Sequence, residues 1–274
     1  SSDWSSDVCS SDLLTGWRKW LSAITSDTYI RLEEKTEEKD VWSIYRLDLS
    51  KFQQPDKTIF GNNSIRQDIY LFQNNRDFSV RFRLDTRDEV NFQYLDGGNI
   101  FDFNEKSIRV IYRFSNQLSS QLDGSSEYKS YDYTNRSDKI IRDNNLSLDL
   151  SFRPKQIIEF ALKSKIAIKK DEALTPFTEA NEFSFMPRAN YSFRDKGKLR
   201  VEFEWTNVEV RPKNRIIPFE LVGINRAGTT LRWLVALNYN ISRYVRATLS
   251  YNGRQEPDRP DTIHVGRAEV RAYF

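Results

Sequence analysis

Charged residues recur at every second position along many stretches of the chain. In 198–204, for example, Arg200, Glu202 and Glu204 alternate with apolar residues. A period of two places alternate side chains on opposite faces of a β-strand, so these charges share one face. If the strands enclose a water-filled interior, basic residues that face it favour anions. Mixed charges on neighbouring strands can instead brace the sheet by forming ion pairs between the strands. We leave both interpretations open. The charged residues that we predict to line this interior are Arg81, Arg83, Arg109, Arg113, Lys163, Lys165, Arg188, Arg200, Glu202, Glu204, Arg232, Arg246, Arg267, Glu269 and Arg271.

Residue types that carry catalysis are scarce. His264 is the single histidine, and no nucleophile elbow accompanies it. Cys9 is the single cysteine, so a cysteine or histidine metal site is not expected. The acidic run at 33–40 could bind calcium through its carboxylates, but it reads more simply as a solvated loop. No glycine-rich phosphate loop occurs. We therefore predict no enzyme activity, no cofactor and no metal.

Composition narrows the class of protein. The 42 basic and 39 acidic residues nearly cancel and are dispersed, which gives no basic patch for nucleic acid. No stretch approaches the roughly 20 apolar residues of a membrane helix. The mean hydropathy of −0.67 suits a soluble protein, but also a membrane barrel, in which only alternate residues face lipid. The 18 Phe, 13 Tyr and 6 Trp favour β structure and interfacial girdles.

Alternation between apolar and polar residues predicts about twelve strands and no long helix. Trp42–Leu47 could form one short helix in a loop. Tight turns and longer polar links alternate between the strands, with 135–138 the one short link where a long one is due. The predicted strands are 28–36, 64–72, 78–86, 107–115, 119–134, 139–153, 156–170, 181–194, 198–210, 229–241, 244–254 and 263–274. The predicted long links are 37–63, 87–106, 171–180, 211–228 and 255–262. Pro187 predicts a bulge or a weakly paired point.

The last strand has an apolar face with small residues and ends on an aromatic residue. Val270, Ala272, Tyr273 and Phe274 resemble the C-terminal assembly signal of Gram-negative outer-membrane β-barrels, although Gly266, Ala268 and Ala272 are smaller than usual. With the strand ladder, residues 28–274 resemble the C-terminal part of such a barrel. The resemblance implies an antiparallel up-and-down transmembrane β-barrel with short periplasmic turns and long outer loops.

That resemblance also implies location in the bacterial outer membrane, contact with its lipid, and recognition by the barrel assembly machinery. The function it implies is structural, or transport of small molecules or ions through a charged, Arg-rich lumen. Turn parity predicts that Phe274 lies at the periplasmic rim. The alternative is a soluble or surface-attached all-β binding protein, which would also use alternating strands.

The N-terminal region divides into two segments. Residues 1–13 resemble the in-frame translation of a sequencing adapter, so we treat them, with Cys9, as non-native. Residues 14–27 form an amphipathic connector in which Trp17 and Trp20 either anchor at a membrane surface or pack as a linker. The barrel domain at 28–274 could therefore be truncated at its N-terminal side.

Overall fold

A computed structural model describes residues 23–37, 58–92, 99–133, 137–173, 177–194, 196–212, 221 and 226–273. Several predictions lie outside these residues: the adapter-like segment at 1–13 with Cys9, the connector through residue 22, the short helix at 42–47, and the position of Phe274.

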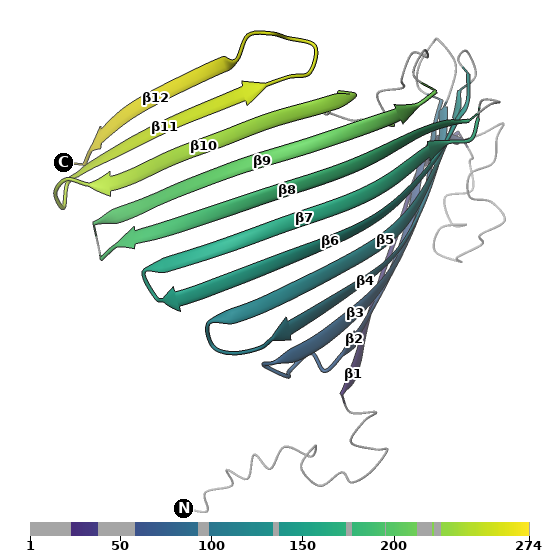
Figure 1. The fold of residues 1–274 in the computed structure, drawn as a ribbon. Helices are drawn as coiled ribbons and strands as arrows, with labels where there is room; N and C mark the ends of the chain where they lie inside the picture. The colour runs from purple at the N-terminus through teal and green to yellow at the C-terminus, as the bar shows by residue number, and fades with distance from the viewer. Residues whose placement is uncertain are drawn as a thin grey trace, which may run out of the picture.

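The described residues form one antiparallel sheet of 12 strands, each paired with its neighbour in the chain (Figure 1). The predicted all-β, up-and-down fold is confirmed. No helix among the described residues is long and apolar enough to cross a membrane. The strands are β1 Ile24–Thr36, β2 Thr58–Leu71, β3 Phe78–Asn91, β4 Asn99–Arg113, β5 Leu118–Tyr133, β6 Lys139–Lys155, β7 Ile158–Asp171, β8 Thr178–Phe193, β9 Gly197–Arg211, β10 Gly228–Asn240, β11 Val245–Gln255 and β12 Ile263–Ala272.

Short connections lie at one edge of the sheet and longer ones at the other, as the sequence predicts. The turn between β2 and β3 shows how the chain reverses: Asn75 Oδ1 accepts hydrogen bonds from the backbone N–H groups of Asp77 (2.8 Å) and Phe78 (3.3 Å). Ser115 Oγ plays the same part between β4 and β5, accepting from Leu118 N at 3.1 Å. Such local bonds favour turns over continued strand. β12 ends at the turn edge, beside the turn between β10 and β11 (Figure 1).

Strands on the long-link side extend further than predicted. The segment 87–106 was expected to be a link, but β3 continues to Asn91 and β4 begins at Asn99. β2 likewise begins at Thr58. At the opposite, turn-side end of the sheet, β1 begins at Ile24, inside the predicted connector. These extensions carry polar residues on both faces, so the alternation that marks a strand disappears although pairing continues.

Pro187 leaves the sheet nearly regular. It pairs with Leu162 on β7, while pairing of β8 with β9 is interrupted between Phe185 and Arg188 without a change of register. The predicted weak point is therefore present and the bulge is not. The reason is that proline lacks the N–H that this side of the ladder requires.

The sheet has two chemically distinct faces. We call the side that carries Arg83, Glu127 and Glu204 the polar face, and the opposite side the apolar face. On the apolar face Leu84, Leu146 and Ile166 are each 50% exposed although they lie within the sheet. In the part of the chain that is described, each strand contacts its neighbours in the sheet, and no second layer covers this face.

The strands form a curved sheet (Figure 1). Side chains are more crowded on the polar face, where Thr206 is 1%, Asp85 2% and Thr230 3% exposed. Because side chains converge on the inside of a curved sheet and spread apart on the outside, this crowding indicates that the polar face is the inner side of the curve. Near the long-link edge, Leu221 is fully buried in a small cluster with Ile141 and Val210 on this face.

The sheet is open. β1 pairs with β2 alone and β12 with β11 alone among the described strands. The backbone groups along the free edges of β1 and β12 therefore have no partner strand in the described part of the chain.

Candidate functional site: the polar face

The strand register places all the charged residues predicted to line an interior on the polar face. On β3 and β4, Arg81 lies directly opposite Arg109. On β8 and β9, Arg188 lies opposite Glu202, and on β9 and β10, Glu204 lies opposite Arg232. On β11 and β12, Arg246 lies opposite Arg271. The polar face thus contains both opposite-charge and like-charge neighbours.

A buried carboxylate organises the polar face of β2 and β3. Asp85 is 2% exposed and accepts hydrogen bonds from Arg66 (2.8 Å) and Arg87 (2.9 Å). Beside it, Arg83 Nε donates to Asp68 at 2.7 Å. Two strands are thereby joined by interlocking ion pairs, which supports the bracing interpretation for this region.

A second network joins β6, β7 and β8. Lys169 lies 3.7 Å from Asp143 and 3.4 Å from Glu182, and Lys165 lies 3.4 Å from Glu182. Lys165 was among the predicted residues, but its acidic partner Glu182 was not. The start of β8, Thr178–Glu182, is polar on both faces apart from Ala180, so no clear alternation marks Glu182 as a polar-face residue.

Arg200 and Arg232 pair with neighbouring glutamates. Arg232 Nη1 lies 3.3 Å from Glu204 Oε2, and Arg200 Nε donates to Glu202 at 3.0 Å. Arg109 pairs with Asp123 and Arg271 with Glu269. The side chains of Arg81 and Arg113 have no hydrogen-bonding or ionic partner among the described residues, so bracing does not account for every cation.

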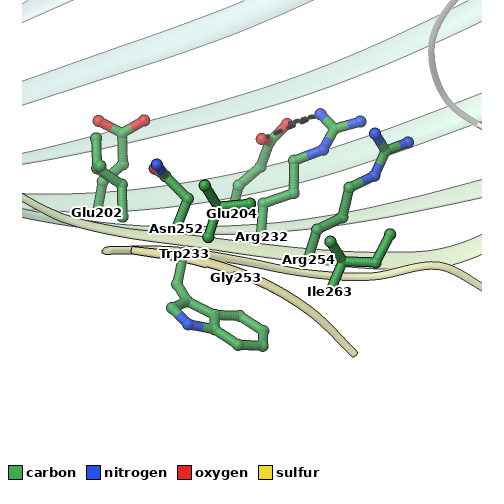
Figure 2. Close-up of a pocket in the computed structure, with 10 residues that line it drawn as sticks. Glu202, Glu204, Arg232, Trp233, Asn252, Gly253, Arg254 and Ile263 are labelled. Carbon is green, nitrogen blue, oxygen red and sulfur yellow. Dashed lines mark hydrogen bonds and ion pairs between the residues drawn. The ribbon is translucent and has the colours of Figure 1, made fainter. Parts of the chain in front are cut away.

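The Arg232 hollow is a depression of about 470 Å³ on the polar face of β9 to β12. Glu204, Arg232 and Arg254 extend into it from one side of the sheet, while Trp233 points to the opposite side (Figure 2). Ile263 and Val265 of β12 form its aliphatic wall. The hollow combines guanidinium groups, carboxylates and apolar surface, as small-molecule sites commonly do.

Residues of two long links join at the rim next to the Arg232 hollow. Glu256 is 7% exposed and lies 2.7 Å from Arg254, 3.7 Å from Arg226 and 3.8 Å from Arg259. Gly228 has a φ of +108°, and a Cβ there would lie 2.6 Å from Pro257. Ionic contacts and close backbone packing thus hold the start of β10 against the end of β11. Glu256 lies in the predicted link 255–262, and the sequence pattern did not indicate this cluster.

Aromatic side chains gather on the apolar face at the long-link ends of β10 to β12. The indole of Trp233 lies over Gly253, where a Cβ would come within 1.9 Å of Trp233 Cε2. His264 Nδ1 lies 2.7 Å from the hydroxyl of Tyr251, and their rings stack at 5.9 Å. Glycine here makes room for a large cross-strand aromatic residue. The histidine therefore belongs to an aromatic cluster on the face opposite the charged residues.

Gly253→Ala should disturb this cluster, because the added methyl group overlaps the indole. We expect a loss of about 1–3 kcal/mol in the free energy of unfolding, the usual cost of overpacking. Urea unfolding in detergent micelles measures the change. Gly266→Ala on the neighbouring strand is the control, because nothing lies within 4 Å of the place that its Cβ would occupy. Equal stability of the two variants would contradict the predicted overlap.

Within the described ranges, no group of three or more His, Cys, Asp or Glu residues is placed to hold a metal ion. His264 has a tyrosine partner and is separated by the sheet from the acids of the polar face.

The fold is similar to that of solved outer-membrane receptors, although the sequence itself matches no family model and no curated protein. Among solved structures, the siderophore receptor PirA from Acinetobacter baumannii superposes with a TM-score of 0.64 at 9% identity, over 91% of this chain and 41% of that one. PirA from Pseudomonas aeruginosa gives 0.59 at 11% identity, over 87% and 38%. The ferric-catecholate import receptor Fiu from E. coli K12, in its open form, gives 0.56 at 7% identity, over 90% and 53%.

The chain thus spans about 40% of the length of the first two receptors. At these identities the likeness shows the fold alone. The twelve-stranded sheet, with its apolar outer side and charged inner side, has the fold of an outer-membrane β-barrel wall.

Proposed function

We propose that this chain forms part of the wall of a wide outer-membrane barrel that takes up hydrophilic solutes. The observation that carries the proposal is the division between the two faces, apolar side chains on the outside of the curve and ion-paired side chains on the inside. A water-filled interior with a lipid-facing exterior produces this division.

The apolar runs on the apolar face are long enough to cross the hydrocarbon core of a membrane. They extend from Phe160 to Ile168 on β7, from Phe183 to Phe193 on β8 and from Leu231 to Tyr239 on β10. Each is about 9–11 residues long, the length of a tilted membrane-spanning strand. Beyond the long-link ends of these runs the same face becomes polar, beginning with Lys170 on β7 and Asn181 on β8. These polar ends would project above the hydrocarbon.

Aromatic rings border the apolar face. At the turn edge, Tyr112 contacts Phe114 at 4.6 Å and Tyr191 contacts Phe193 at 4.9 Å between ring centroids. At the other border lie Trp233 and Trp205, the latter 5.5 Å from Phe183. Two such girdles mark the two membrane interfaces of a barrel.

The free edges of β1 and β12 require partners in this setting. An unpaired backbone N–H or C=O group in hydrocarbon costs several kcal/mol, so a membrane sheet must close. We propose that further strands complete a wider barrel, as the partial coverage of the receptors suggests. The named receptors bind siderophores or import ferric catecholates, and by analogy we propose uptake rather than catalysis.

The last strand is the proposed contact with the barrel assembly machinery. Val270 is 68% exposed on the apolar face of β12, next to Ala272, and Tyr273 N donates to Tyr244 O at 2.8 Å. Because β12 is the last strand of the sheet, the backbone groups along its free side can pair with another strand.

Detergent dependence tests the proposed function. The 274-residue chain should need detergent micelles or lipid to stay folded, because no second layer of the described residues covers its apolar face. Joined to the strands that complete the barrel, it should migrate differently on gels before and after heating, because a closed β-barrel resists unfolding by the gel detergent, and it should give discrete conductance steps in planar bilayers. A water-soluble monomer that folds without detergent would refute the membrane location, and folding without conductance would restrict the chain to a structural wall.

A further inference from the structure

We infer that the Arg232 hollow binds a small solute with one carboxylate and an apolar remainder, such as an aromatic monocarboxylate. The inference rests on the proposed uptake function and adds the chemical class of a solute. It concerns one place on the polar face, between β9 and β12.

Arg232 and Arg254 lie directly opposite each other on β10 and β11. Like charges in this position repel, so each guanidinium benefits from a nearby anion. Glu204 lies 3.3 Å from Arg232, and Glu256 lies 2.7 Å from Arg254. Glu256 also serves Arg226 and Arg259, so one carboxylate is shared among three guanidinium groups. Asp258, 3.4 Å from Arg226, offsets only one of them. At the rim, three guanidinium groups therefore face two carboxylates, whereas the charges that line the hollow itself balance, with two arginines against two glutamates.

Arg254 has a donor that folding leaves unused. Its Nε is buried and has no hydrogen-bond partner, although Nη2 of the same group binds Glu256. An unsatisfied buried donor is unfavourable by about 1–3 kcal/mol, and a bound oxygen would remove that cost. Guanidinium groups match the two oxygens of a carboxylate, which favours this anion at Arg254.

The opposite wall of the hollow is aliphatic. Ile263 and Val265 occupy the polar face at the start of β12, where the following positions carry Arg267, Glu269 and Arg271. They are 39% and 51% exposed. With a volume of about 470 Å³ the hollow can hold a ring or short chain against these residues. Glu202 and Glu204, which also line it, would repel a second negative charge on the solute.

Benzoate binding tests the inference. Isothermal titration calorimetry is performed on the full chain in zwitterionic micelles, after circular dichroism has established the β-sheet fold. Benzoate should bind saturably, whereas benzamide, its neutral counterpart, and inorganic phosphate should bind at least tenfold more weakly. Arg254→Gln should raise the Kd of benzoate at least tenfold, and Val265→Asp should do the same by charge repulsion.

Arg246→Gln is the matched control, because Arg246 lies on the same face of β11 but outside the hollow. It should change the Kd less than twofold. Equal effects of Arg254→Gln and Arg246→Gln, equal binding of benzamide, or no benzoate binding by the folded protein would overturn the inference. The last result would leave the uptake proposal standing, whereas folding without detergent would refute that proposal whether or not benzoate binds.

Discussion

Leu148→Arg is expected to lower the free energy of unfolding by about 2–4 kcal/mol, the cost of an arginine at the middle of a bilayer on the lipid side of a barrel. Leu148 lies on the apolar face of β6, is 38% exposed, and faces Leu122 on β5. Arginine there would be surrounded by lipid and by apolar side chains. Urea unfolding in phospholipid vesicles, followed by tryptophan fluorescence, measures the loss.

Two controls separate lipid contact from general disturbance. Ser147→Arg introduces the same side chain one residue earlier, on the polar face between Asp123 and Lys165, and should change stability by less than about 1 kcal/mol. Ile140→Arg lies on the apolar face at the long-link end of β6, where the cost should fall to about 0–1 kcal/mol. Equal losses at Leu148 and Ile140 would contradict the membrane placement.

Asp85→Ala is expected to destabilise the protein by about 3 kcal/mol. The carboxylate is 2% exposed and bonds both Arg66 and Arg87, so its removal leaves two guanidinium groups without their partner. Breaking a buried ion pair costs about 3–5 kcal/mol, and we take the lower end because the two arginine side chains are 38% and 44% exposed. The same urea unfolding experiment measures the change.

Glu269→Ala provides the comparison. It removes the partner of Arg271 on β12, but both side chains of this pair are largely exposed, at 44% and 64%. Exposed pairs contribute about 0–1 kcal/mol, so this variant should be nearly as stable as the parent. Similar losses for Asp85→Ala and Glu269→Ala would show that burial does not govern the strength of these pairs.

Local patterns were sufficient for the strands near the turn edge. In β9 the alternation of Leu199, Val201 and Phe203 with Arg200 and Glu202 predicts both the strand and its two faces. Alternation did not predict the strand where both faces are polar, as at the long-link end of β3 beyond Asp85. There the strand continues because its backbone pairs with β4, which is a property of the neighbouring strand and not of the segment itself.

By itself, the sequence determined the class of fold, the direction of the strands and the face on which each charge lies, because a period of two and the alternation of short and long connections are local features. The tertiary structure decided which charges meet, as with Lys169 and Glu182, and it created the Arg232 hollow from four strands. It also decided that His264 packs with Tyr251 and that Leu221 is buried on the inner side. These features depend on register and curvature, which arise only when neighbouring strands pair and bend together.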